Sequence, residues 1–323
     1  MRTDDDQFKA MTFGYPEYIP VAVHLLPATW MTYREELDAL VRRHPVIFGP
    51  DQPERRDYDA VERERCRRGQ HVDAWGCVWS NIREGMASVV TGHPVPTREA
   101  VHRLRPPEAD EGLPHGFMYM RLGYLRGFEE IMIDFAEEPP ELQMLIDVVL
   151  EYNLRQLDLL LARQDGPGQL LRFGDDLGVQ TSPPISPGKW RKYLEPCYAE
   201  MYGRVRRAGH YVYMHSDGHM LEVIPDLIDC GVNVINPQIR ANGLEGLVEV
   251  CKGKVCVDLD LDRQMFPFCS PSDIDEHVHE AVDKLGSPAG GLWLEAECAP
   301  DVPLENIEAI CQALEKYRGY YRH

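Results

Sequence analysis

The sequence predicts an α/β protein: a (β/α)8 TIM barrel that forms a single domain over residues 1–323 with an N-terminal extension. A chain of 323 residues is a common length for one such barrel. From residue 116 onward, short apolar strands alternate with amphipathic helices, which is typical of βαβ units and a parallel sheet. Polar residues directly follow several of these strands, at the end where barrels place their active sites.

Residues 1–110 form a less regular part that includes the first strand. The apolar segment 18–26 predicts that strand, and 32–43 follows as a helix. The charge-rich segment 49–70 is interpreted as a solvated helix or loop. The segment HVDAWGCVW at 71–79 is dense in aromatic and acidic residues, and 94–107 is interpreted as a connection with a short helix.

The remaining chain predicts an alternation of strands and helices. Strands are expected at 117–122, 169–173, 211–214, 232–235, 255–257 and 291–294. Helices are expected at 129–136, 140–163, 221–229 and 244–251, and from 187, 271 and 303 onward. Ser186 and Ser270 each precede a proline, as helix N-caps do, and Pro196 should bend or break its helix. No GxGxxG motif follows the first strand, which disfavours a doubly wound sheet, the alternative fold.

Composition limits the partners and the location. A formal net charge of −19 argues against nucleic acids and anionic membrane surfaces. The nine cysteines are odd in number, irregularly spaced and without a CxxC pair, which indicates reduced thiols. The acidic segment 1–6 does not resemble a signal peptide, and no apolar run approaches the roughly 20 residues of a membrane span. We therefore expect a cytoplasmic protein.

Polar residues gather at the predicted strand ends. The pairs are Asp175 and Asp176, His215 and Asp217, Asn236 and Gln238, and Asp258 and Asp260, and the last strand adds Glu295, Glu297 and Cys298. In a barrel these positions share one face. Neighbouring carboxylates raise one another's pKa, which suits acid–base chemistry or cation binding.

These residues allow a metal site as well as purely structural roles. A histidine with a nearby carboxylate and a later Cys or Glu supplies enough ligands for zinc, so His215, Glu297 and Cys298 are the predicted ligands. Three protein ligands and one open position would make such a site catalytic. The structural alternatives are a turn or helix cap at Asp175 and Asp176, a core histidine at 215 and a buried thiol at 298.

Several motifs cover about half of the chain: DDLGVQ at 175–180, ISP at 185–187 with Trp190, HSDG at 215–218, GVNVINP at 231–237 and DVPLENI at 301–307. Together, and in this order, they resemble the uroporphyrinogen decarboxylase superfamily. The segment at 71–79 also resembles the Asp-x-Trp-Gly pattern of methyltransferase-like members. The resemblance implies a (β/α)8 barrel, often a homodimer.

The resemblance implies one of two chemistries. Decarboxylases of this superfamily work without a metal and depend on an arginine-rich motif near the first strand, where this chain has LPATWM at 26–31. Corrinoid-linked methyltransferases hold zinc with a His-x-Cys pair and a later Cys. Here the pair is replaced by His215-x-Asp217, and the later ligand is Glu297 or Cys298.

The leading hypothesis is a methyltransferase-like enzyme that moves a methyl group to or from a corrinoid or a small acceptor. Zinc, and a corrinoid carried by a partner protein, are the cofactors expected for this activity. The expected catalytic residues are Asp176, His215 and Asp217. The expected substrate-binding residues are Asp73, Trp75, Asp175, Gln180, Asn236, Gln238 and Asp260.

Two alternatives stay open. A metal-free decarboxylase of a porphyrinogen or another carboxylated ring would need arginines at the site, for which Arg121, Arg172 and Arg240 are the candidates. A binding subunit without catalytic activity would have its site plugged by side chains or loops.

Overall fold

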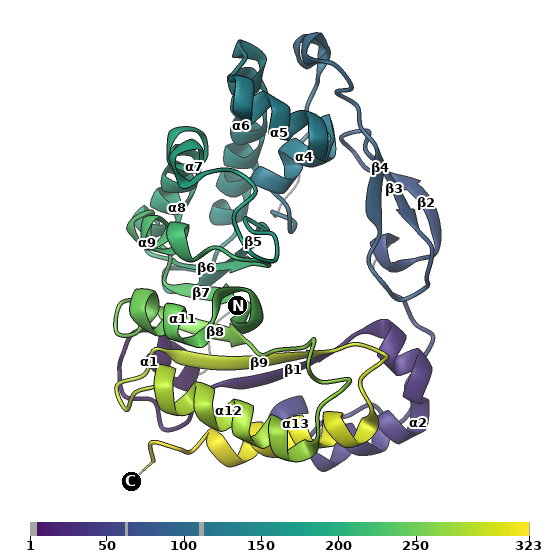
Figure 1. Ribbon diagram of the computed structural model, residues 1–323, viewed down its shortest axis with the longest axis vertical. Coiled ribbons are helices and arrows are strands. Elements are labelled where there is room, and N and C mark those ends of the chain that lie inside the picture. The colour runs from purple at the N-terminus through teal and green to yellow at the C-terminus, as the bar shows by residue number, and fades with distance from the viewer. Residues whose placement is uncertain (1–4, 62–63, 110–112, 323) are drawn as a thin grey trace. The chain divides into compact units, whose positions relative to one another are not determined.

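The computed structural model describes residues 5–61, 64–109 and 113–322. The chain folds into two compact units (Figure 1). Gln70–Ser80 and Val89–Pro237 make up the first unit, and Asp4–Gly69, Asn81–Ser88 and Gln238–His323 the second, apart from residues outside the described ranges. Residues 1–4, on which part of the signal-peptide expectation rests, lie outside those ranges. The single-domain expectation stays a prediction.

The first unit is built on three parallel strands. They are β5 (Leu170–Gly174), β6 (Tyr211–Ser216) and β7 (Val234–Pro237). β6 lies between β5 and β7, and the register aligns Gly174 with His215 and His215 with Asn236. Aligned residues of parallel strands point to the same face of the sheet. His215 and Asn236 therefore share one face at the carboxyl ends of neighbouring strands.

Helices surround these strands. The helices of the first unit are α4 (Tyr119–Arg126), α5 (Phe128–Glu137), α6 (Pro140–Ala162), α7 (Pro187–Tyr193), α8 (Glu195–Arg207) and α9 (Ile224–Asp229), with short 3₁₀ turns at Arg98–Arg103 and Leu221–Val223. α8 packs against β6, and α6, α7 and α9 contact α8 (Figure 1). The helix that begins at 187 breaks at Leu194, two residues before Pro196, as predicted.

The predicted strand at 117–122 is wrong, because this segment enters helix α4 at Tyr119. Gly116 has a positive φ of 76°, which turns the chain immediately before the segment. The backbone N–H groups of residues 118–120 donate to the side chain of Asp175 instead of to a neighbouring strand. A short apolar run does not by itself distinguish a strand from a buried helical turn.

A small sheet accounts for the segment at 71–79. It contains β2 (Gly69–Val72), β3 (Val78–Asn81) and β4 (Val89–Gly92) in that order, with β3 and β4 antiparallel. The turn between β2 and β3 holds Asp73 and Trp75. This hairpin was not predicted from the sequence.

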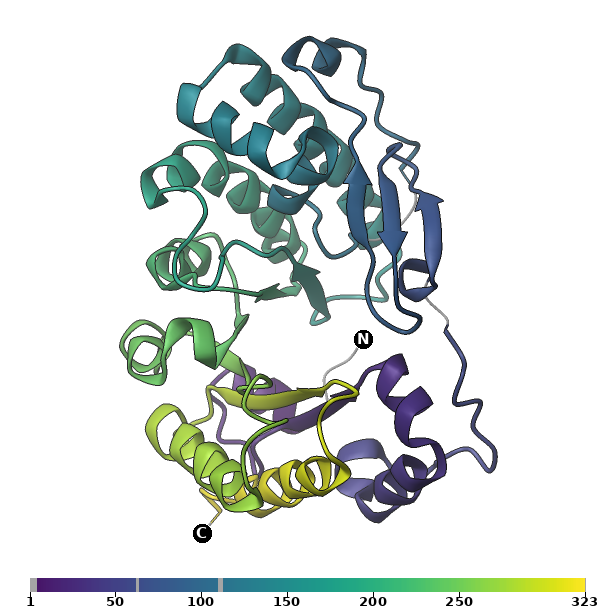
Figure 2. The same cartoon turned by 45° about the vertical axis from the view of Figure 1, so that its right-hand side comes forward.

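The second unit contains the other three parallel strands. These are β1 (Val21–Leu25), β8 (Cys256–Asp260) and β9 (Leu292–Cys298), with β9 between β1 and β8. Its helices are α1 (Asp5–Met11), α2 (Pro27–Arg43), α3 (Pro45–Phe48), α10 (Ile239–Asn242), α11 (Leu244–Cys251), α12 (Pro271–Leu285) and α13 (Leu304–Tyr317), with a 3₁₀ turn at Glu64–Cys66. α13 packs against β1, β9 and α12, and Figure 2 shows α12 beside α13.

The predicted α/β class with parallel strands is confirmed. Among the described residues, six strands pair in parallel, three in each unit, and the closed eight-stranded barrel stays a prediction. All nine cysteines are free thiols and seven are buried, as expected. Within the described ranges, every helix is too short or too polar to span a bilayer.

Helix α12 begins with a capping box that offers a test of local stability. Ser270 Oγ accepts from the Asp273 N–H, and the Asp273 carboxylate accepts from the Ser270 N–H. We expect Ser270→Ala to lower the free energy of unfolding by about 1 kcal/mol in urea denaturation followed by circular dichroism. Ser272→Ala, an exposed change in the same turn, is the control and should be neutral; equal effects of the two variants would contradict the capping role.

Candidate active site

The carboxylate of Asp175 anchors the start of helix α4. Asp175 is fully buried, and it accepts hydrogen bonds from the backbone N–H groups of residues 118–120 and from the Tyr198 hydroxyl at 2.7 Å. Burial raises the pKa of Asp175 above its ordinary value, while the hydrogen bonds from Tyr198, Met120 and Tyr119 oppose the shift. The buried Asp175 side chain therefore holds the start of α4 against the end of β5, and its substrate contact stays a prediction.

The anchored segment brings His115 beside the next carboxylate. His115 Nε2 lies 3.1 Å from Asp176 Oδ1, and His215 Nε2 lies 3.7 Å from the same oxygen. Asp217 adds its Oδ1 at 3.4 Å from His215 Nε2 and donates its backbone N–H to Asp176 at 3.0 Å. The three predicted catalytic residues Asp176, His215 and Asp217 therefore lie together, with His115 as a fourth member.

The electrostatics of Asp176 follow from these neighbours. Burial alone would raise the pKa of its carboxyl, but the His115 hydrogen bond, the Asp217 N–H and the histidine charges hold that pKa below its ordinary value. Asp176 is therefore a carboxylate near neutral pH. It is available to bind a cation or to accept a hydrogen bond.

Asn236 orients the ring of His215. The His215 Nδ1 and Asn236 Oδ1 atoms are within hydrogen-bond distance. Because an amide oxygen only accepts, Nδ1 carries the proton and donates. The other ring nitrogen, Nε2, then faces the carboxylates of Asp176 and Asp217. This arrangement is favourable when Nε2 is protonated or when a cation lies between these groups.

Two glycines fix the spacing of the loops that carry Asp176 and Asp217. A Cβ added at Gly178 would come within 2.4 Å of the His219 backbone, and one added at Gly218 would come within 2.3 Å of the Gly178 backbone. Gly218 also has a positive φ of 81°. The two loops touch through their main chains, which only glycine permits at both positions.

An apolar cavity opens beside Asp176. Its volume is ≈ 360 Å³, within the range of small-molecule sites, and all of its lining residues belong to the first unit. Asp176 is its one acidic lining residue among those described, and Tyr119, Phe128, Ile131 and Val179 contribute apolar surface. The cavity can hold an apolar group next to the polar cluster.

Asp73 and Trp75 lie elsewhere in the first unit, beside Arg121. Asp73 Oδ2 accepts from Arg121 Nη1 at 2.9 Å and from Trp79 Nε1 at 3.1 Å. Burial would raise the pKa of Asp73, but hydrogen bonds from Trp79 and Cys77 and the charge of Arg121 hold it below its ordinary value. Trp75 packs edge-on against Tyr152, with ring centroids 4.8 Å apart.

The second unit has its own row of titratable residues at strand ends. The register aligns His24 of β1 with Glu297 and Asp260 of β8 with Glu295. His24 Nε2 lies 3.2 Å from Glu295 Oε2. Arg263 donates to Glu297 at 2.7 Å and lies 3.7 Å from Asp260. Asp260 is buried, which fits a structural role as well as the predicted substrate contact.

The remaining predicted residues are placed as follows. Glu297 and Cys298 belong to the second unit and His215 to the first, so a metal held by His215, Glu297 and Cys298 stays a prediction. Burial raises the pKa of the Cys298 thiol to about 12. Gln180 is exposed on the loop after β5, and Gln238 bridges to Asp260.

The three arginines of the decarboxylase alternative have different surroundings. Arg121 is buried and lines a cavity. Arg172 is exposed and stacks on Tyr213, with its Cζ 4.1 Å from the ring centroid. Arg240 is largely exposed and pairs with Asp262 at 2.9 Å.

Sequence reasoning missed His115 and His24. His115 follows a proline and precedes a glycine, a loop context that was the one available signal. His24 lies inside the first apolar strand, where a polar residue in a buried segment was the signal.

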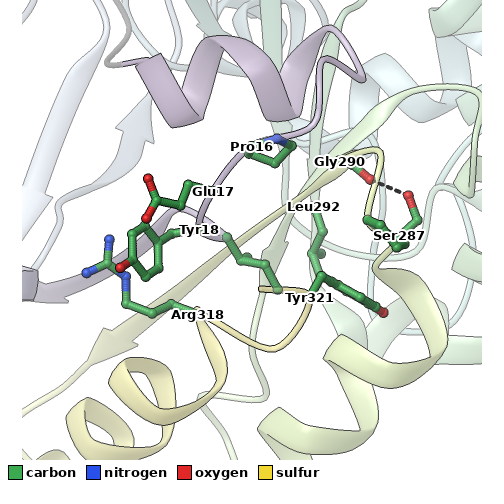
Figure 3. Close-up of a pocket in the computed structure, with 10 residues that line it drawn as sticks. Pro16, Glu17, Tyr18, Ser287, Gly290, Leu292, Arg318 and Tyr321 are labelled. Atoms are coloured by element: carbon green, nitrogen blue, oxygen red, sulfur yellow. Dashed lines mark hydrogen bonds between the residues drawn. The ribbon is translucent and has the colours of Figure 1, made fainter. Parts of the chain in front are cut away.

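A cavity near the C-terminus has no capacity for a ligand. Tyr18, Ser287, Arg318 and Tyr321 are among its lining residues (Figure 3). Its volume of ≈ 10 Å³ is about that of one water molecule.

This chain is an α/β protein that carries a cluster of histidines and carboxylates at the carboxyl ends of parallel strands. Enzyme active sites commonly form at such strand ends. The family model described as Uroporphyrinogen decarboxylase (URO-D) matches residues 116–317, well over half of the chain. The chain belongs to this family. The resemblance inferred from the sequence motifs is thereby confirmed.

Comparison with solved structures supports the fold. A methyltransferase from Methanosarcina mazei matches with a TM-score of 0.62 and 16% identity, over 96% of this chain and 98% of that one. A dihydropteroate synthase from Xanthomonas albilineans matches at a TM-score of 0.31 with 15% identity, over 46% of this chain and 52% of that one. The second likeness is too weak to use. The search among curated proteins gave no match.

The His24 and Glu295 pair predicts a measurable titration. The hydrogen bond to Glu295 is the largest cause that raises the pKa of His24 above its ordinary 6.5. This pair stabilises the fold fully below about pH 6.5, and the contribution is lost as pH rises through the folded-state pKa. We expect Glu295→Gln to lower the His24 pKa in an NMR titration. Glu276→Gln, exposed on α12, is the control; an unchanged His24 pKa in Glu295→Gln would refute the pairing.

Proposed function

We propose that this chain is a methyltransferase-like enzyme of the uroporphyrinogen decarboxylase family, which moves a methyl group to or from a corrinoid or a small acceptor. The observation that carries the proposal is the cluster of His115, Asp176 and His215 beside an apolar cavity. The methyltransferase that shares the fold over nearly the whole chain is consistent with it.

The donor set of the cluster fits a zinc ion. One ligand atom from each of His115, Asp176 and His215 lies within 4.8 Å of the other two. Ligand atoms around tetrahedral zinc stand roughly 3.3 Å apart, and the 3.1 and 3.7 Å separations from Asp176 Oδ1 bracket that value. Asn236 accepts a hydrogen bond from His215 Nδ1, and metal-binding histidines are usually oriented in this way through their other ring nitrogen. In this proposed ligand set, His115 and Asp176 take the places that the sequence analysis assigned to Glu297 and Cys298.

A bound zinc ion would act as a Lewis acid that lowers the pKa of an acceptor's thiol or hydroxyl. The chain's own residues have separate tasks. Asp217, which lies beside His215, would accept the acceptor's proton, and Asn236 would keep His215 Nε2 turned toward the carboxylates. The apolar cavity would hold the apolar part of the substrate beside Asp176.

The proposed transfer is a displacement at carbon. The acceptor's electron pair forms a bond to the methyl carbon as the bond from that carbon to its donor atom breaks, and the donor atom keeps the bonding pair. A corrinoid would be presented by a separate partner protein. The polar cluster needs no redox partner for this step.

Metal binding tests the cluster directly. We expect the purified chain to bind about one Co(II) per chain, with the intense visible bands of tetrahedral cobalt. His115→Ala, Asp176→Asn and His215→Ala should abolish these bands, and Asn236→Ala should weaken affinity roughly 10- to 100-fold.

Matched variants separate the two ligand sets. His102→Ala, an exposed histidine of the first unit, should leave the cobalt spectrum unchanged. Cys298→Ser should also leave it unchanged. If a thiolate-to-cobalt band appears in the wild type and disappears in Cys298→Ser, the ligand set is His215, Glu297 and Cys298 instead.

The reaction is tested with methylcobalamin and a panel of thiols, monitored by the absorbance change on demethylation. We expect Asp217→Asn to slow transfer by roughly 10²- to 10⁴-fold, because it removes a proton acceptor, while His102→Ala has no effect. Release of carbon dioxide from a porphyrinogen without methyl transfer would refute the proposal and favour the decarboxylase alternative.

A further inference from the structure

The turn between β2 and β3 holds Arg121 in a fixed orientation that the proposed methyl transfer does not use. Asp73 Oδ1 accepts from the backbone N–H groups of Trp75 and Cys77 at 3.0 and 2.9 Å. Its other oxygen accepts from Trp79 and Arg121. Because four donors share this carboxylate, Asp73 is held in place and in turn orients the Arg121 guanidinium through one of its edges.

Arg121 is buried but still has donors to offer. Its side chain is 8% exposed; it donates a hydrogen bond to Asp73 through Nη1 and also interacts with the Cys77 thiol. A guanidinium carries five N–H donors. None of its nitrogen atoms is both sealed from solvent and without a partner, so the remaining N–H groups face open space. The rings of Trp75 and Tyr124 lie 5.9 and 5.3 Å from its Cζ.

That open space is a second cavity of the first unit. Its volume is ≈ 510 Å³, which suits a small molecule. Besides Arg121 and Asp73, its walls include Trp75, Phe117 and Tyr152. Three aromatic side chains around one guanidinium form a mixed surface, apolar on the walls and cationic at one point.

The residues that line this cavity favour a ligand of a particular charge and shape. Arg121 is the one basic residue and Asp73 the one acidic residue among the described lining residues, and Asp73 is occupied. A planar guanidinium pairs best with a carboxylate through two parallel hydrogen bonds. A polyanion would meet a single cation in a chain of net charge −19, so a monoanion fits better.

We propose that this cavity binds a small aromatic monocarboxylate, with its carboxylate on Arg121 and its ring against Trp75, Phe117 and Tyr152. The proposal stands apart from the methyl-transfer reaction, because it concerns a different cavity and is tested by binding alone. Pro114 and Phe117 line this cavity on either side of His115 in sequence. A ligand here therefore contacts the segment that positions His115.

Calorimetric titration of the full chain with 2-naphthoate tests the proposal. We expect 2-naphthoate to bind at least about tenfold more tightly than neutral 2-naphthamide or acetate. Arg121→Gln should weaken naphthoate binding by at least about tenfold and leave the affinity for naphthamide unchanged. Arg155→Gln, an exposed change on α6 near Tyr152, should bind like the wild type.

A second variant keeps the test decisive if Arg121→Gln does not fold. Arg121→Lys retains a cation beside Asp73 but lacks the planar fork, and it should bind naphthoate at least about tenfold more weakly with an unchanged circular dichroism spectrum. Equal affinities of naphthoate and naphthamide, or of Arg121→Lys and the wild type, would overturn the proposal. So would the absence of naphthoate binding, or phosphate binding as tight as that of naphthoate.

Discussion

A fully buried carboxylate must be matched by hydrogen bonds, and in the first unit Asp175 obtains them from the start of helix α4. The first N–H groups of a helix lack partners within the helix, so one side chain satisfies several of them at once. The Tyr198 hydroxyl completes the set. Removing any of these donors would leave part of a buried charge uncompensated, which makes the arrangement hard to vary.

The position of α4 sets two separate features. His115 lies just before the anchored amides and meets Asp176, the residue that follows Asp175. Arg121 lies in the first turn of the helix and meets Asp73 from the turn between β2 and β3. A single buried contact at the end of β5 thus positions both the polar cluster around Asp176 and the cavity lined by Arg121. The two features are coupled through the backbone of one short segment.

Much of the arrangement could be predicted from the sequence, and the failures have physical causes. β5, β6, β8 and β9 were located because a strand buried in a parallel sheet is a continuous apolar run ending in polar residues. Asp176, His215 and Asp217 were predicted as site residues because they lie at or directly after the ends of two of these strands. His115 did not, because its approach to Asp176 depends on the long-range contact of Asp175 with residues 118–120, which no local pattern encodes. The same contact made an apparent strand at 117–122 a helix.

The main-chain contact between Gly178 and Gly218 separates the spacing of the site from the identity of its side chains. Because the loops that carry Asp176 and Asp217 touch through their backbones, the separation of these two positions belongs to the scaffold and not to the side chains. Exchanging an acid for a thiol or an amide at either position would alter the chemistry while the frame stays in place. In this chain, the chemistry at these two positions can therefore be varied separately from their spacing, as long as both glycines are kept.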